Sequence, residues 1–139
     1  MFTQSRPHQQ HSMSSMYHKV QTDTGVDSAS PHRLVEMLFE GFFDSCSQAR
    51  GHIRAGNVEQ KCRSLARAAR IVDEGLKAPL DLQAGGELAK DLRDLYAYVT
   101  VRLTHANLQN DEAAVDECQR LMRPIHSAWT AIGGQFGTA

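Results

Sequence analysis

The sequence predicts an all-α protein, namely an antiparallel up-and-down four-helix bundle preceded by a mobile N-terminal arm. Apolar residues recur at three- and four-residue spacing from Ser30 to about Ile132, and no alternating pattern typical of strands competes. Turn-forming residues divide this pattern into four segments of roughly 20 residues joined by short loops. The chain has 139 residues, 41% of them hydrophobic, which is enough for one domain with a real core.

The first two helices are bounded by capping residues. Ser30, followed by a proline at the first helical position, predicts the start of the first helix, and Gly56 suits the left-handed residue at its end. Asn57 then caps a second helix, with Gln60 in capping-box register, and Pro79 stops it. We expect the inward face of this second helix to carry Cys62, Leu65, Ala69, Val72 and Leu76.

The third and fourth helices follow the Gly85–Gly86 loop and are separated by a turn over Asn107–Asp111, and Gly133–Gly134 closes the last one. Pro124 lies inside the fourth helix, where it costs about 3 kcal/mol, and we expect a bent helix there. The predicted inward faces carry Leu88, Leu92, Leu95, Tyr96, Val99, Leu103 and Ala106 in the third helix, and Ala114, Cys118, Leu121, Met122, Ile125, Trp129 and Ile132 in the fourth.

The domain boundaries follow from composition. Residues 1–29 are rich in Gln, Ser, Thr and His, so we predict a flexible arm, followed by the bundle over 30–132 and a flexible tail over 133–139. A short helical segment is expected near 13–20, because its large side chains follow helical spacing. These side chains are Met13, Met16, Tyr17 and Val20.

Composition and motifs exclude several functions. The formal net charge of −1 argues against nonspecific nucleic-acid binding, and we expect the basic residues of the second helix on a solvated face. We find neither a long apolar run nor a secretion signal, so we predict a cytoplasmic protein without membrane insertion. The sequence holds no phosphate-binding loop, nucleophile motif or Glu-x-x-His pair, so we predict no enzyme activity and no cofactor.

Metal binding is a minor alternative. The three cysteines, Cys46, Cys62 and Cys118, form no CxxC pair and are expected to be reduced, buried thiols rather than a metal cluster. Three histidines in the arm lack partners that would fix their geometry, so a solvated arm is favoured there. These are His8, His11 and His18. We therefore predict no metal site.

Apolar residues outside the predicted core stripes are the most informative feature. Successive helical residues are rotated by about 100°, which places Met37 at the margin of the first stripe and Ile71 well away from the second. Tyr98 and Val101 likewise point away from the third stripe. Isolated surface hydrophobes are common, but if Ile71, Tyr98 and Val101 are contiguous they form an exposed groove suited to an amphipathic helix of a partner.

Several motifs occur in the order and at the spacing of one known family. They are SPHRLVEMLFEG at 30–41, IVDEGLK at 71–77, GGEL at 85–88, LYAY at 95–98, RL at 102–103, ANLQND at 106–111 and AW at 128–129. Together they resemble the flagellin export chaperones, the FliS family, over residues 17–132.

This resemblance implies a small helical bundle that binds newly made flagellin in the bacterial cytoplasm. Such a chaperone takes up the disordered C-terminal segment of flagellin, prevents premature polymerisation and delivers the subunit to the flagellar type III export apparatus. Among the residues of this chain, we expect the flagellin contacts to include Met37, Ile71, Tyr98 and Val101.

The resemblance also implies a role for the N-terminal arm as a lid over the groove or as a docking segment for the export gate. Tyr17 matches the arm tyrosine of the family, and Met13, Met16 and Val20 complete its apolar face. A helical adaptor for another amphipathic segment, such as an anti-sigma regulatory factor, fits the same surface, and the sequence alone does not separate the two functions.

Overall fold

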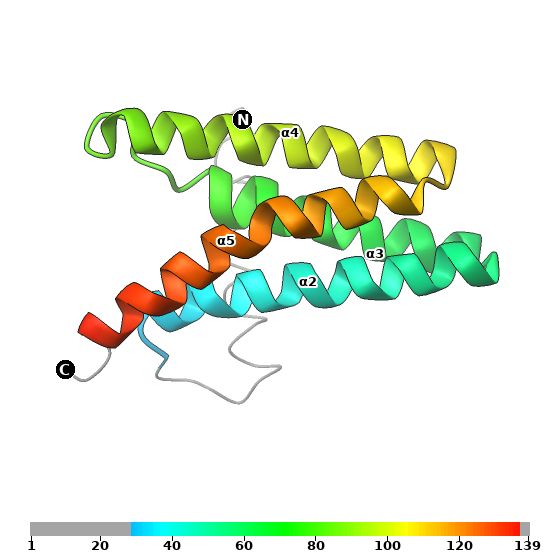
Figure 1. Ribbon diagram of the computed structural model, residues 1–139, viewed down its shortest axis with the longest axis horizontal. Helices are drawn as coiled ribbons and strands as arrows, with labels where there is room; N and C mark the ends of the chain where they lie inside the picture. The colour runs from blue at the N-terminus through cyan, green and yellow to red at the C-terminus, as the bar shows by residue number, and fades with distance from the viewer. Residues whose placement is uncertain (1–28, 137–139) are drawn as a thin grey trace, which may run out of the picture.

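The computed structural model describes residues 29–136, which form four helical rods and no strand (Figure 1). Rods that follow one another in the chain pack together, and the last rod also packs on the first. The predicted antiparallel four-helix bundle is therefore confirmed. In these residues we find no helix both apolar and long enough to cross a membrane. The elements are α2 (Pro31–Ala55), α3 (Val58–Arg70) continued by the π-helix η1 (Ile71–Lys77), α4 (Gly86–Gln109) and α5 (Glu112–Phe136).

Helix ends lie close to where the sequence predicts them. The Ser30 hydroxyl accepts a 3.1 Å hydrogen bond from the Arg33 backbone N–H, and Gly56 follows α2 in the left-handed region at φ 75°. Asn110 ends α4 in the same way at φ 51°. The predicted capping box at the start of α3 is wrong, because the Asn57 side chain makes no cap hydrogen bond.

The inward face of α3 is rotated from the predicted one, and this corrects the placement of Ile71. Lys61 looked solvent-facing in the sequence, but it is only 5% exposed. Its ammonium donates to the Asn107 carbonyl at 2.9 Å and to Asn110 Oδ1 at 2.6 Å, while its alkyl stem lies in the core. The buried face that includes Lys61 also includes Ile71, which is 3% exposed. The buried residues of this face are Lys61, Ser64, Leu65, Ala68, Ile71, Val72, Gly75 and Leu76.

The α3 rod ends in a π-helical turn that the sequence did not indicate. The Ala78 N–H donates to the Asp73 carbonyl at 3.0 Å, a span of five residues. In this wider turn the adjacent residues Ile71 and Val72 are both buried against α2 and α4. Ile71 is therefore part of the core and not of a free surface.

The wide apolar arc of α2 is also used inside the bundle. Met37 is 5% exposed, which corrects its placement on a free margin. Phe43, which a helical wheel places on the opposite edge of the same arc, packs partly buried against the core. Because α2 contacts α3, η1 and α5, it needs a broader apolar arc than a helix with one neighbour.

Helix α5 runs through Pro124 as one helix and changes direction near its middle, as the sequence predicts (Figure 1). The predicted stop at Gly133–Gly134 is wrong, because α5 continues to Phe136. Gly133 instead makes room for a neighbouring ring, since a Cβ atom there would lie 2.1 Å from His32 Cε1.

The first half of α5 is tied to α2 by ion pairs. Arg50 donates to Glu112 at 3.0 Å, to Asp116 at 3.1 Å and to Gln119 at 2.9 Å. Arg54 also pairs with Glu112. These bonds hold the start of α5 against the end of α2.

The second half of α5 is tied to α2 by a reciprocal pair that we call the His32–Trp129 clamp. His32 Nε2 lies 2.7 Å from the Trp129 carbonyl, and Trp129 Nε1 donates to the His32 carbonyl at 3.0 Å. A carbonyl only accepts, so His32 carries its proton on Nε2. The two rings stack with centroids 4.7 Å apart and 5° between their planes. Helix α5 is therefore attached to α2 along its whole length.

Two of the three cysteines lie in the core as free thiols. Cys46 and Cys118 are fully buried, and Cys62 is half-buried. Burial raises the pKa of Cys118 to about 12. Burial also raises the pKa of Cys46, with the neighbouring Cys118 as a second cause. Both thiols therefore stay protonated at physiological pH, which does not favour metal binding.

We predict that a thiol reagent at pH 8 modifies Cys62 and leaves Cys46 and Cys118 unmodified until the protein unfolds. The folded state keeps two protons that the unfolded chain releases near pH 9. The free energy of unfolding should therefore fall as the pH rises above 9. Thiol counting with and without denaturant, and urea unfolding between pH 8 and 10.5, test this; native-state modification of all three thiols would contradict it.

Candidate functional site

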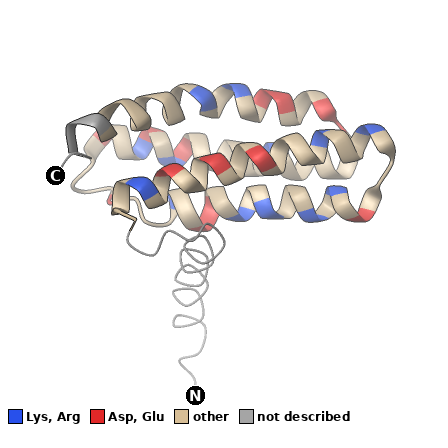
Figure 2. Ribbon diagram, turned by 90° about the horizontal axis from the view of Figure 1, so that it is seen from below, with Lys and Arg blue, Asp and Glu red and all other residues tan. Residues whose placement is uncertain are grey.

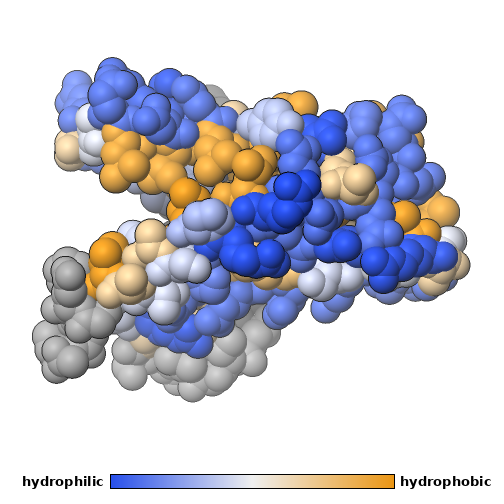
Figure 3. Space-filling model, in the orientation of Figure 1, coloured by the Kyte–Doolittle hydropathy of each residue, from blue (hydrophilic) through white to orange (hydrophobic). Residues whose placement is uncertain are grey.

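Helices α4 and α5 are joined near Glu117 and then separate. Glu117 accepts hydrogen bonds from the Tyr98 hydroxyl at 2.6 Å and from Arg102 Nε at 2.8 Å. Beyond this point α5 follows α2 through the His32–Trp129 clamp and leaves α4 behind (Figure 1). In the same orientation, Figure 3 shows an apolar cleft between α4 and the far end of α5.

One wall of this cleft belongs to α4. Arg102 points to α5, and Leu95 and Leu88 precede it by one and two heptads, so both lie on the same side of the helix. Leu92 and Leu95 pack partly buried against the core, whereas Leu88 is 68% exposed. The predicted core position of Leu88 is therefore wrong.

The other wall belongs to the second half of α5. Leu121 and Ile125 follow Glu117 by four and eight residues on its α4-facing side, and both pack partly buried against the core. Ile132 continues this side and is 39% exposed, which corrects its core position. The two walls form what we call the α4/α5 groove, lined by Leu88, Leu92, Leu95, Leu121, Ile125 and Ile132.

The closed end of the groove is polar and fixed. The hydrogen bond from Tyr98, followed by that from Arg102, lowers the pKa of Glu117, and the same bond raises the pKa of Tyr98. Glu117 is therefore ionised and Tyr98 protonated at neutral pH. The six lining residues carry no ionisable group, so the groove offers apolar contact rather than acid–base chemistry.

Two of the four predicted contacts stay exposed, but the four do not form one surface. Tyr98 is 44% exposed beside the groove. Val101 is 65% exposed and lies two residues from buried Val99, hence on the opposite face of α4. Ile71 and Met37 are buried, so the contiguous surface of Ile71, Tyr98 and Val101 is not found. The predicted lid residues lie outside the described part of the chain, namely Met13, Met16, Tyr17 and Val20.

The sequence predicts the groove residues in the core because a helical wheel assumes that an apolar stripe meets a neighbouring helix along its whole length. The available signal was Pro124, which indicates that α5 changes direction. A bend toward α2 draws the end of α5 away from α4 and leaves both stripes partly uncovered. The sequence predicts the bend but not its direction.

Figure 2 shows both acidic and basic residues on the rods of the bundle, with Lys and Arg grouped along the middle of α3. On α3, Arg63 pairs with Glu59 at 2.9 Å, and Arg70 pairs with Glu74 at 3.2 Å. Arg67 donates to the Ser45 hydroxyl at 3.1 Å. The basic residues of α3 are thus largely engaged within the bundle, and the apolar groove is the distinctive surface.

Comparison with known proteins assigns the family. The family model "Flagellar protein FliS" matches residues 13–135. The chain belongs to the FliS family. Among its relatives, the flagellar secretion chaperone FliS of Salmonella typhimurium is 44% identical over 84% of this chain and 86% of its own. FliSB of Pseudomonas aeruginosa is 36% identical over 84% and 91%, and FliS of Escherichia coli is 39% identical over 81% and 83%.

The family match confirms the resemblance to the FliS family that the sequence motifs indicate. The relatives are flagellar secretion chaperones, so this FliS-family chain is a chaperone of flagellar secretion and not an enzyme. The matched region covers the four helical rods except Phe136 at the end of α5, and it includes both walls of the α4/α5 groove.

We predict that Trp129→Phe loosens the groove wall of this FliS-family chain. Phenylalanine keeps the stacked ring but loses the donor to the His32 carbonyl, which costs about 1 kcal/mol. Amide hydrogen exchange should become about fivefold faster in α5 after Pro124 and stay unchanged in α4. Tyr98→Phe, which removes the exposed hydrogen bond from α4 to Glu117 in the first half of α5, is the matched control and should leave the end of α5 unaffected.

Proposed function

We propose that the chain binds the C-terminal segment of flagellin in the α4/α5 groove, in the bacterial cytoplasm. Binding prevents premature polymerisation and keeps the subunit available for delivery to the flagellar type III export apparatus. The observation that carries this proposal is the apolar groove, because a chaperone of flagellar secretion needs a surface for its export substrate.

The size of the groove suits a short amphipathic helix. Leu88 to Leu95 spans about 10 Å of α4 and Leu121 to Ile132 about 16 Å of α5, at 1.5 Å per residue. A bound helix of two to three turns, with apolar residues at i, i+3 or i+4 and i+7, covers both walls. The occupant then supplies the neighbour that α4 and α5 lack.

The energetics suit a complex that must later release its cargo. Covering a leucine such as Leu88 contributes about 1.5–3 kcal/mol. A disordered segment that folds on binding loses conformational entropy, which offsets part of this gain. The export apparatus can therefore remove the flagellin segment from the groove.

The contacts we propose differ from those that the sequence favoured. Leu88 and Ile132 are exposed groove contacts, and Tyr98 contributes at the closed end. Met37 and Ile71 are buried and are not among them, and Val101 lies on the opposite face. The lid or docking role of residues 13–20 belongs to this proposal, and deletion of residues 1–20 would test it through flagellin affinity and export-gate association.

We predict that Leu88→Asp lowers the affinity for flagellin at least tenfold, because a carboxylate in the groove must lose its hydration on binding. Val101→Asp is the matched control, since Val101 is nearly as exposed on the same helix but faces away from the groove. Titration of fluorescent flagellin, and of flagellin lacking its C-terminal segment, measures both effects.

The two variants separate the alternatives. Equal affinities of Leu88→Asp and wild type would contradict the groove, and a loss confined to Val101→Asp would favour the surface that the sequence predicted. Binding of truncated flagellin with full affinity would exclude the C-terminal segment as occupant. Tight groove-dependent binding of an anti-sigma regulatory factor, without flagellin binding, would indicate the adaptor function instead.

A further inference from the structure

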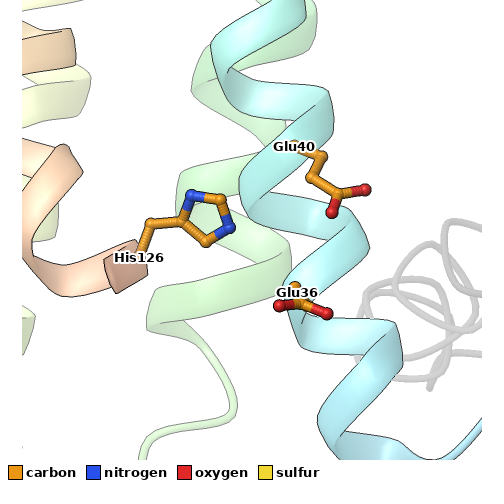
Figure 4. Close-up of side chains that lie close together, drawn as sticks. All are labelled: Glu36, Glu40 and His126. Atoms are coloured by element: carbon orange, nitrogen blue, oxygen red, sulfur yellow. The ribbon is translucent and has the colours of Figure 1, made fainter. Parts of the chain in front are cut away.

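Three side chains with metal-ligating atoms meet between α2 and α5, on the side of α5 away from the groove. Glu36 and Glu40 lie one turn apart on α2, and His126 reaches toward them from α5 (Figure 4). One ligand atom from each residue lies within 4.8 Å of the other two. The set combines two carboxylate oxygens with an imidazole nitrogen from a second helix.

The surroundings fix two of the three ligands. The His126 ring stacks on Phe39, with centroids 5.3 Å apart and 12° between the planes, and lies 5.5 Å from the Phe43 ring. The Thr130 hydroxyl donates to Glu36 Oε2 at 2.8 Å, which orients that carboxylate. A bound cation would thus meet ligands whose outer contacts are already in place.

A cationic group already bridges the two carboxylates. Arg33 Nη1 donates to Glu36 Oε1 at 2.8 Å and to Glu40 Oε2 at 3.0 Å. Burial would raise the pKa of Glu36, but hydrogen bonds from Thr130 and Arg33 outweigh it and lower that pKa, so the carboxylate is ionised at neutral pH. The Arg33 side chain is 43% exposed, so it can move into water when another cation takes its place.

We propose that Glu36, Glu40 and His126 form a binding site for a divalent first-row transition metal ion, with Zn²⁺ as its best probe. Zn²⁺ accepts imidazole and carboxylate ligands at about 2.0–2.2 Å, which places tetrahedral ligands roughly 3.5 Å apart. The three atoms must therefore close by about 1 Å, and the exposed Glu40 side chain can supply this by rotating once Arg33 has left it. An imidazole ligand disfavours Mg²⁺ and Ca²⁺, which take oxygen ligands.

Such an ion would cross-link α2 to the part of α5 that follows Pro124. That part of α5 forms one wall of the α4/α5 groove, so the ion would stiffen the groove from behind without contacting its occupant. The metal site requires no partner protein, so a negative result in the zinc experiment would not contradict the proposed flagellin binding.

The test is to titrate Zn²⁺ into the untagged, chelator-treated full-length chain. Calorimetry measures the zinc affinity, and thermal unfolding measures the change in Tm. Zinc at about 100 times the Kd should raise Tm by roughly 10 °C if it binds only the folded state. The background variant His8→Gln/His11→Gln/His18→Gln removes the other histidines that could bind zinc near the N-terminus. In that background, His126→Gln and Glu36→Gln should each lower zinc affinity at least tenfold.

Two variants make the result specific. His105→Gln is the matched control, because His105 is a half-buried histidine that contacts one acid, Asp111, and it should leave zinc affinity unchanged. Arg33→Gln should raise zinc affinity, since it removes the competing cation, whereas a purely structural cluster would show no such gain. Unchanged affinity in His126→Gln, no gain in Arg33→Gln, or Mg²⁺ binding as tight as Zn²⁺ would each overturn the proposal.

Discussion

The attachment of α5 to α2 along its whole length is the constraint on which the rest of the structure depends. Ion pairs from Arg50 fix the start of α5, and the His32–Trp129 clamp fixes its end. Helix α4 shares only the first half of α5, near Glu117. A helix that follows one neighbour throughout must diverge from a second neighbour that is not parallel to it, and the α4/α5 groove is the space that results.

The α4/α5 groove can stay open because the buried polar groups of the bundle form their hydrogen bonds outside it. Within the described residues, no buried side-chain nitrogen or oxygen lacks a hydrogen-bond partner. The Lys61 ammonium, for example, satisfies the end of α4 from inside the core. The uncovered surface is therefore apolar, and apolar surface costs free energy in water but breaks no hydrogen bond. A partner can cover it without replacing any internal contact.

The sequence predicts local structure better than it predicts which faces meet. Ser30 acts through its capping side chain, and Gly56 and Pro124 act through their own backbone geometry. These local roles can be inferred from the sequence alone, and the structure confirms them. A helical wheel centred on the stripe from Cys62 to Leu76 predicts Ile71 on the surface. Only the tertiary structure shows that Lys61 is buried and that the rod widens into a π-helix at Ile71. Glu36 and His126 are 90 residues apart, so no local motif signals that they meet.

The contacts that position the second half of α5 lie on its α2 side, opposite the groove. His126, Trp129 and Thr130 point from α5 toward α2, whereas Leu121, Ile125 and Ile132 face α4. The groove wall is therefore held by residues that an occupant does not touch. A wall fixed in advance loses little conformational entropy when the site is filled, so the ordering cost of binding falls mainly on the incoming segment. Affinity then depends on the occupant's own tendency to form a helix, which favours a segment that is disordered when free and helical when bound.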